Sequence, residues 1–336
     1  MNGKLLCMET PESFEFLAIG DTVVEPFIKL TEGHVQETAK GAELCLPYGA
    51  KIPYEYAPLL SGVGNSANAA VSAARLGLKS ALLTWVGDDA SGKDCETHFK
   101  EEGVSTDLVQ VESNKTTNHH FVLWFGDDRT ILVKHELFDY TLPAIGTPKW
   151  IYFSSLAAHT EEFHEQVTEY VKNNPQILLA FQPGTFQLKM GKSLALYQHT
   201  TVVCMNKEEA QTLLETDEHN IKTLLDGLEV LGPKTILITD GPHGAYMKSD
   251  NTYFNMPIYP DIAPPLERTG AGDAFFSTFI SYLAKGYDAA YAIKRAPINS
   301  MNVVQHIGAQ EGLLSEEKIE EYLKKAPSAY ALRILE

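Results

Sequence analysis

The chain has 336 residues, 44% of them hydrophobic and 21% charged, so it is long enough to bury a sizeable core in one large domain or two ordinary ones. Its formal net charge of −17 disfavours nucleic acids and anionic membrane surfaces as partners. Four scattered cysteines without a CxxC pair, no leader pattern and no membrane-length apolar segment favour a soluble, cytoplasmic protein with reduced thiols.

Short apolar segments alternate with stretches of helical pattern along the chain. The first predicted strand, 14–19, ends at Gly20. Residues 69–76 carry alanine and other apolar residues at helical spacing, and Gly77 follows as a common helix stop. Further buried strands are predicted at 81–86, 150–153, 177–181, 201–204 and 235–239. This alternation predicts an α/β fold whose mainly parallel sheet is covered by helices on both faces.

One region interrupts the alternation. Residues 119–125 and 130–135 are both strand-like, and the turn-forming residues 126–129 join them into a predicted β-hairpin. The segment from about 23 to 60 is also rich in strand-like and loop-like residues. Together they predict a small sheet over one end of the main sheet; the alternative is a hairpin decorating an edge.

Two glycine-containing segments resemble nucleotide-binding motifs. Residues 62–67 fit the dinucleotide pattern GxGxx(G/A), with Asp88 and Asp89 near the position of a ribose-binding acid, and so suggest a dehydrogenase. The preceding residues contain Pro53 and Pro58, which disfavour the central strand that this pattern requires. The tripeptide 191–193, GKS, lacks the earlier glycine of a P-loop and predicts a turn with a helix start.

Residues 270–273, GAGD, precede a predicted buried helix that continues from 274. Small residues at a helix start leave the backbone N–H groups open to a ligand, and these groups favour anions such as a transferring phosphoryl group. Asp273 is placed to accept the proton of an attacking hydroxyl. The alternative is a glycine-rich turn in which Asp273 caps the helix.

Residues 267–273 resemble the C-terminal signature of the ribokinase-like (PfkB) carbohydrate kinases, commonly written DTTGAGD. The match is close from Thr269 to Asp273, whereas Glu267 and Arg268 stand where Asp and a small residue are usual. Residues 64–68, GNSAN, resemble the N-terminal signature of the family, a glycine-rich loop over the sugar. The resemblance implies that Gly64, Asn65 and Asn68 bind the acceptor.

Three further segments match the family in the same order along the chain. Asn206 and Glu209 match its NxxE motif, which organises Mg²⁺ and phosphates through water, although in isolation the pair suits a helix cap with an acidic first turn. Thr239, Gly241 and Gly244 match its nucleotide loop TxGxxG. Asn299, with 308–310 beyond it, resembles the segment beside the adenine.

The resemblance implies a ribokinase-like three-layer sandwich in one domain, 1–336, with a β-sheet lid from about 23–60 and 117–136. It also implies an ATP-dependent transfer of phosphate to a hydroxyl of a sugar or sugar-like molecule. Asp273 is then the base, and the backbone of Gly270, Ala271 and Gly272 is the anion hole. ATP and Mg²⁺ are the implied cofactors, a monovalent cation such as K⁺ is left open by Glu267 and Arg268, and a homodimer through the lids is expected.

The acceptor is less defined than the chemistry. The family supplies an Asp five residues after the first glycine, where this chain has Glu25, and Asp21 directly follows Gly20; either carboxylate suits hydroxyl recognition. Lys134 and the histidines 119 and 120 lie in the predicted lid and suit an acidic sugar or a solvated surface. Gln182 stands where many relatives carry Asp, which suggests a non-standard acceptor.

Three alternative functions stay open from the sequence. A nucleoside kinase would share the fold and the phosphate-binding residues. A catalytically silent regulator would bind sugar or nucleotide on the same fold, although retention of Asp273 and of the Asn206–Glu209 motif disfavours it. A dehydrogenase depends on residues 62–67 alone.

Overall fold

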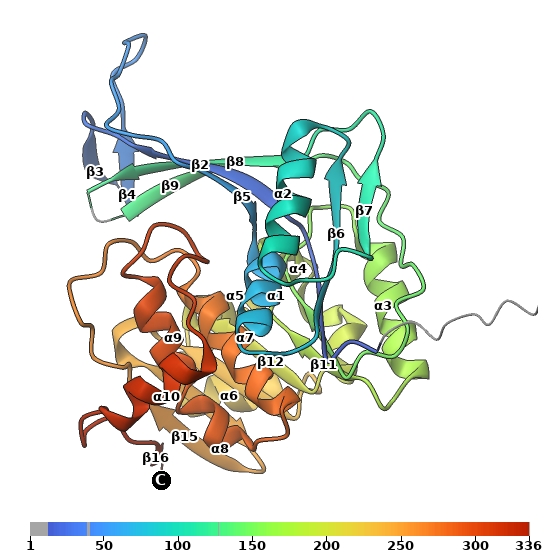
Figure 1. Ribbon diagram of the computed structural model, residues 1–336. Coiled ribbons are helices and arrows are strands. Elements are labelled where there is room, and N and C mark those ends of the chain that lie inside the picture. The colour runs from blue at the N-terminus through green and yellow to red at the C-terminus, as the bar shows by residue number, and fades with distance from the viewer. Residues whose placement is uncertain (1–12, 39–40, 127, 336) are drawn as a thin grey trace, which may run out of the picture.

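The computed structural model describes residues 13–38, 41–126 and 128–335 (Figure 1). The six buried strands predicted outside the hairpin all lie in one ten-stranded sheet. From β7 to β13 neighbouring strands run parallel, and the other three are antiparallel. The mainly parallel sheet is therefore confirmed. In spatial order its strands are β16 (Arg333–Ile334), β15 (Thr252–Met256), β14 (Ala245–Ser249), β13 (Thr235–Thr239), β12 (Val202–Asn206), β11 (Leu178–Phe181), β10 (Trp150–Phe153), β1 (Phe16–Ile19), β6 (Ser80–Gly87) and β7 (Val109–Glu112).

The two faces of this sheet carry two separate hydrophobic clusters. In β1, Phe16 and Ala18 point to one cluster and Leu17 and Ile19 to the other, as the two-residue period of a strand requires. Such doubly buried strands are uniformly apolar, which is why the sequence marked them so clearly.

Helices cover both clusters, which gives the three layers seen in Figure 1. One face packs against α1 (Asn65–Arg75), α2 (Ala90–Glu101), α7 (Ala271–Ala284), α8 (Ala289–Ile293), α9 (Ala296–Val303) and α10 (Glu316–Lys324). The other packs against α3 (Glu161–Asn173), α4 (Thr185–Met190), α5 (Lys207–Leu214), α6 (Ile221–Glu229) and the 3-10 turn η2 (Ala195–His199). The tripeptide GKS forms a 3-10 turn, η1 (Gly191–Ser193), as predicted. No described helix is long and apolar enough to cross a membrane.

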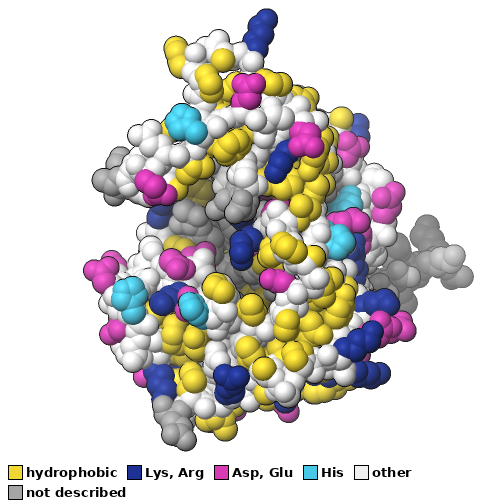
Figure 2. All heavy atoms as spheres, turned by 90° about the vertical axis from the view of Figure 1, so that its left-hand side faces the viewer, with side chains coloured by type: hydrophobic (Ala, Val, Ile, Leu, Met, Phe, Trp, Pro, Cys, Tyr) yellow, Lys and Arg dark blue, Asp and Glu magenta, His cyan; other side chains and the backbone are white. Residues whose placement is uncertain are grey.

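A second, four-stranded sheet lies over one end of the main sheet (Figure 1). Its order is β5 (Leu59–Val63), β2 (Val23–Lys29), β8 (Asn118–Phe125) and β9 (Asp128–Lys134). The predicted hairpin is β8 and β9, and it pairs with β2, so it does not decorate an edge of the main sheet. The strands β3 (His34–Thr38) and β4 (Gly41–Cys45) form a separate hairpin. Figure 2 shows hydrophobic side chains on this upper part and on the body below, with a hollow between the two.

Candidate active site

The loop before α7 has a backbone that only glycine suits. Gly270 has φ 77°, and a Cβ there would lie 2.2 Å from the Cβ of Ala309. Helix α7 then begins at Ala271, and Gly270 makes no side-chain cap. The N–H groups of the first helical turn therefore have no acceptor within the helix, and they form the kind of site that binds anions.

Asp273 lies in this first turn and is 7% exposed. Its Oδ1 accepts hydrogen bonds from Asn65 Nδ2 at 2.7 Å and from Gln182 Nε2 at 3.1 Å, and its Oδ2 accepts from Asn68 Nδ2 at 2.8 Å. Burial raises the pKa of Asp273, while the three amide donors oppose that rise because they favour the charged form. Its side chain does not cap α7, so the capping interpretation of Asp273 is wrong.

The start of α1 brings two of these amides, those of Asn65 and Asn68, to Asp273. Gly64 has φ 116°, and a Cβ there would lie 2.7 Å from the backbone oxygen of Asp21. The preceding strand β5 is antiparallel and at the edge of the small sheet. It is not the central parallel strand that a dinucleotide-binding loop needs, which agrees with the argument from Pro53 and Pro58.

The carboxylates of Asp21 and Glu25 are both buried and face histidines from the small sheet. Asp21 Oδ1 accepts from Tyr140 Oη at 2.8 Å, its Oδ2 accepts from the Ala157 N–H at 2.7 Å, and His135 Nδ1 lies 3.2 Å from Oδ2. His120 Nδ1 lies 3.5 Å from Glu25 Oε1. The negative charge of Glu25 raises the pKa of Asp273, so the carboxylates of Glu25 and Asp273 interact electrostatically.

Two other polar side chains of the small sheet lie elsewhere. Lys134 is exposed. The ring of His119 is hydrogen-bonded through Nδ1 to the backbone oxygen of Thr117 at 2.9 Å and lies near Ser91 Oγ.

Asn206 and Glu209 form a reciprocal cap at the start of α5. Asn206 Oδ1 accepts from the Glu209 N–H and Glu209 Oε2 accepts from the Asn206 N–H, both at 2.8 Å. Burial raises the pKa of Glu209, and the charge of Asp273 raises it further. Glu209 therefore caps α5 and also lies near Asp273. The cap uses its Oε2, so Oε1 takes no part in it. No group of three or more His, Cys, Asp or Glu side chains suited to a metal occurs among the described residues.

A cavity of about 250 Å³ lies beside the first turn of α7. Thr239, Gly241 and Gly244 line it together with Ala271 and Gly272, so three predicted nucleotide-binding residues meet the predicted anion hole. The rest of its lining is Pro242, Ala245, Ile258, Tyr259, Asp261, Pro265, Arg268, Phe275, Pro297, Ser300, Met301 and Val304.

Asn299 does not line this cavity. It is fully buried, donates to Thr278 Oγ1 at 2.8 Å and accepts from the Leu314 N–H at 2.9 Å. Its neighbour Ser300 lines the cavity and donates to the backbone oxygen of Ala271 at 2.6 Å.

Residues 60–316 match the model of the pfkB family carbohydrate kinases. The chain belongs to this family. A ribokinase of Bacillus subtilis is 29% identical over 266 residues, which cover 77% of this chain and 87% of the relative. This carbohydrate kinase therefore has the family membership that its five ordered motifs predicted.

Solved structures confirm the ribokinase fold. A ribokinase of Arabidopsis thaliana, complexed with ribose and ATP, superposes with a TM-score of 0.75 at 18% identity, covering 93% of this chain and 99% of that one. A putative ribokinase II of E. coli, in complex with ATP and Mg²⁺, gives a TM-score of 0.71 at 19% identity, covering 92% of this chain and 99% of that one. At these identities the likeness shows the fold alone.

Sequence reasoning missed several residues that support the kinase site. Glu267 is 3% exposed and accepts from the backbone N–H groups of Thr269 and Gly308. Tyr152 donates to Gln182, and Tyr140 donates to Asp21. Gln310 was predicted only as part of the segment beside the adenine, and its side chain donates to Asn68. No local pattern could mark the two tyrosines, because their partners are 30 and 119 residues away. Glu267 departs from the family pattern, and that departure alone does not predict these two hydrogen bonds.

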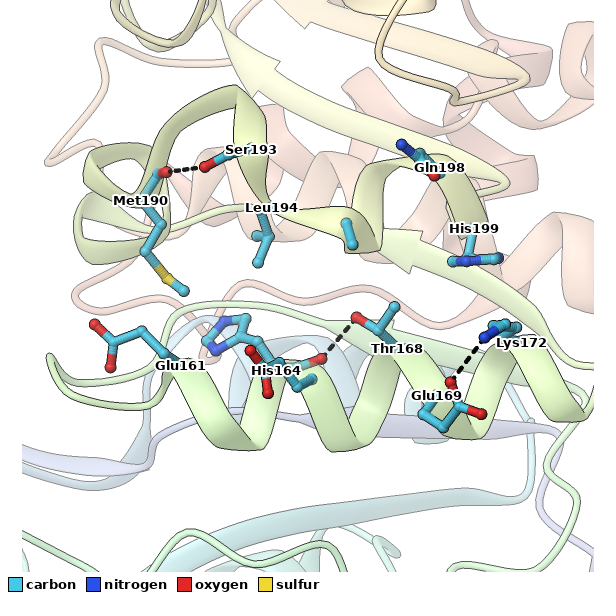
Figure 3. Close-up of a pocket in the computed structure, with 12 residues that line it drawn as sticks. Glu161, His164, Thr168, Glu169, Lys172, Met190, Ser193, Leu194, Gln198 and His199 are labelled. Atoms are coloured by element: carbon cyan, nitrogen blue, oxygen red, sulfur yellow. Dashed lines mark hydrogen bonds and ion pairs between the residues drawn. The ribbon is translucent and has the colours of Figure 1, made fainter.

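A larger hollow, about 710 Å³, lies between α3 and the turns η1 and η2 (Figure 3). It contains none of the predicted site residues. In Figure 3 its labelled side chains come from α3 and from residues 190–199, and these two segments bond within themselves: Lys172 pairs with Glu169, and Ser193 donates to the backbone oxygen of Met190. Size therefore does not identify the site, whereas the gathering of predicted residues around Asp273 does.

Proposed function

We propose that this kinase transfers the terminal phosphoryl group of ATP to a hydroxyl of a sugar or sugar-like acceptor, with Asp273 as the base. The observation that carries the proposal is the place of Asp273 in the first turn of α7. Three amides hold its carboxylate in a buried position, and its neighbours Ala271 and Gly272 line the cavity beside Thr239 and Gly241. A base and an anion site thus share one helix turn.

The cavity suits a nucleotide. Its apolar members, such as Ile258 and Met301, offer a surface for a base, and the glycine loops offer backbone N–H groups for phosphates. Glu209 Oε1, which is free of the helix cap, and Asn206 would hold a hydrated Mg²⁺ through water. When bound, Mg²⁺ neutralises the negative charge of the phosphate oxygens.

The residues of the chain then have distinct tasks. Asp273 takes the proton from the acceptor hydroxyl, and the N–H groups of Gly270, Ala271 and Gly272 stabilise the charge on the transferring group. Asp21, Glu25, Asn65 and Asn68 orient the hydroxyls of the acceptor. The small sheet acts as a lid that excludes water, which would otherwise compete for the phosphoryl group.

The lid is also the proposed contact between two copies of the chain. Phe121 of β8 and Leu132 of β9 face each other across the hairpin, so they lie on the same face of the small sheet, where they are 42% and 52% exposed. Such a patch on a sheet suits association with a second copy. Sedimentation of Leu132→Glu against the wild type tests it: a wild-type dimer that becomes a monomer is expected, and a monomeric wild type would refute it.

Activity is tested by supplying ATP and Mg²⁺ with a panel of D-ribose, other sugars, a keto-deoxy sugar acid and nucleosides, and detecting phosphorylated product. Asp273→Asn is expected to lower kcat by about 10²–10⁴-fold, the usual contribution of a general base. Asp288→Asn is the matched control, since Asp288 is an exposed helix cap on α8 that accepts from the Tyr291 N–H. Undiminished product from Asp273→Asn would refute the proposed base.

A further inference from the structure

Gln310 is a buried residue whose side chain contacts β5, the start of α1, and α2. It is 6% exposed, and its side chain makes three hydrogen bonds. Its Nε2 donates to the backbone oxygen of Gly62 at 2.8 Å and to Asn68 Oδ1 at 2.9 Å. Its Oε1 lies 2.6 Å from His98 Nε2. Every polar atom of this carboxamide is therefore in use.

One backbone carbonyl determines the direction of all these bonds. The oxygen of Gly62 can only accept, so the group facing it must be the amino group of Gln310. That amino group has two hydrogens, and the second requires an acceptor, which is Asn68 Oδ1. Gln310 Oε1 then faces His98, whose Nε2 must carry a hydrogen and does so in both the charged imidazole and one neutral tautomer.

The same logic reaches the catalytic site. Because Asn68 Oδ1 faces Gln310, Asn68 Nδ2 faces Asp273 and donates to its Oδ2 at 2.8 Å. We propose that Gln310, held by His98, is a positioning residue that fixes the amide of Asn68 with its amino group toward Asp273 and so favours the ionised carboxylate. The proposal rests on the function proposed above, in which the ionised Asp273 is the base.

Loss of Gln310 would remove the donor that holds Asn68 Oδ1 and would leave the charge of Asp273 as the one remaining partner that orients this amide. A rotated Asn68 would direct its oxygen at the carboxylate, where two acceptors repel each other and only protonation of Asp273 relieves the conflict. Gln182 has a comparable brace, since Tyr152 donates to its Oε1. Removing Gln310 therefore affects one of three amide donors.

Other titratable groups around Asp273 are untouched by this change. Glu25 on β2 and Glu209 on α5 carry like charges, and Tyr152 on β10 and Cys204 on β12 are buried next to it. Around His98, the pair Arg75–Glu102 is the neighbouring charge pair, at 2.7 Å. A change at Gln310 leaves all of them in place, so a shift in Asp273 would report on the Asn68 amide.

The test measures Asp273 directly and needs no known acceptor. In full-length protein labelled with ¹³C at aspartate carboxyls, the Asp273 signal is assigned by its loss in Asp273→Asn and titrated with pH. In Gln310→Met the pKa of Asp273 is expected to be about one unit above that of the wild type, the size of one lost hydrogen bond to a charged group. An unchanged or lower pKa would overturn the proposal.

Gln187→Met is the matched control. Gln187 is a fully buried glutamine that donates to the backbone oxygen of Ser154 and accepts from the Gly184 N–H, without contact to the amides around Asp273. It should lose stability as Gln310→Met does, while the pKa of Asp273 stays at the wild-type value. An equal shift in both variants would mean general loosening and would overturn the positioning role.

His98→Phe is the second variant, used also if Gln310→Met does not fold. It keeps a ring on α2 but removes the donor to Gln310, so a smaller rise in the pKa of Asp273 is expected. If Gln310→Met and His98→Phe fold and neither raises this pKa, the proposal is overturned.

Kinetics of Asp273→Asn separate the role of Asp273 as the base from the positioning role of Gln310. If that variant stays active, Asp273 is not the base even where the titration shifts; if it is inactive and the titration is unmoved, only the positioning role fails.

Discussion

The carboxylate of Glu267 accepts a hydrogen bond of 2.8 Å from the N–H of Gly308 and another from the N–H of Thr269. It thus ties the loop that leads into α7 to the loop that follows α9. We expect Glu267→Ala to lower the free energy of unfolding by about 2–3 kcal/mol, because two N–H groups lose a charged partner. Chemical denaturation measures this, and a higher KM for ATP should accompany it because Arg268 lines the cavity.

Two variants accompany this measurement. Glu267→Asp introduces the residue that the family pattern has at this position, one methylene shorter, and should lose less than Glu267→Ala. Glu311→Ala changes an exposed glutamate close to the same loop and should leave both quantities unchanged. If Glu267→Ala and Glu311→Ala unfold at the same denaturant concentration, the hydrogen bonds of Glu267 do not stabilise the fold.

Gly270 and Gly272 should respond oppositely to the same added methyl group. Gly270→Ala combines a left-handed φ of 77° with a contact of 2.2 Å to Ala309, so a loss of about 2 kcal/mol or more in folding stability is expected. At Gly272 the nearest atom to a new Cβ is Gln182 Nε2 at 3.9 Å, so Gly272→Ala should fold normally. It should still lower kcat, because the methyl group is added within the anion site and projects toward Gln182, whose amide donates to Asp273.

Thermal unfolding and kcat together check this contrast. The pair controls itself, since both changes are Gly→Ala in the same turn. Equal losses of Tm in the two variants, or an unaffected kcat in Gly272→Ala, would refute the assignment.

The parts that were predicted from sequence are those with local signals. Doubly buried strands such as β10, Trp150–Phe153, are unbroken apolar runs, and α1 ends before Gly77, whose φ is 83°. The glycine signatures around Gly64 and Gly270 mark backbone conformations that other residues avoid. Local chemistry therefore defined both the sheet and the two loops that carry the site.

What sequence reasoning missed depends on distant contacts. The antiparallel strands β14 and β15 have mixed burial, so their pattern is weaker than that of the central strands. Asn299 matched the motif by position, yet its side chain points into the packing between α7 and α9, toward Thr278. The hydrogen bond from Gln310 to Asn68 joins residues that are 242 positions apart, so no local sequence pattern can predict it.

The structure does not test whether the kinase depends on K⁺, so this dependence stays a prediction.

Glu209 has two roles that a single substitution can separate. Glu209→Gln keeps an oxygen that accepts from the Asn206 N–H, so the cap on α5 survives and stability should change by less than about 0.5 kcal/mol. Removal of the charge should raise the Mg²⁺ concentration needed for half-maximal activity. Glu209→Ala should lose the cap as well, at a cost of about 1 kcal/mol.

Magnesium titrations of activity and chemical denaturation of both variants distinguish the roles. Glu208→Gln, an exposed neighbour in the same helix turn, is the control. Normal Mg²⁺ dependence in Glu209→Gln would leave Glu209 as a capping residue alone.

The pH dependence of activity should follow the ionisation of Asp273. Burial raises its pKa, and the like charge of Glu25 raises it further. Since the base must be ionised, kcat/KM is expected to fall as the pH drops through this raised pKa. Glu25→Gln removes the like charge, so the pKa of Asp273 should fall and the acid limb of the profile should move to lower pH.

The profile is measured with the best acceptor from the activity screen. If Glu25 also binds the acceptor, its loss lowers kcat/KM equally at every pH, which displaces the profile vertically and leaves the sideways shift readable. Glu43→Gln, on the exposed strand β4, changes the net charge by the same amount and should not move the limb. An acid limb that stays in place or moves to higher pH in Glu25→Gln would mean that Asp273 does not set it.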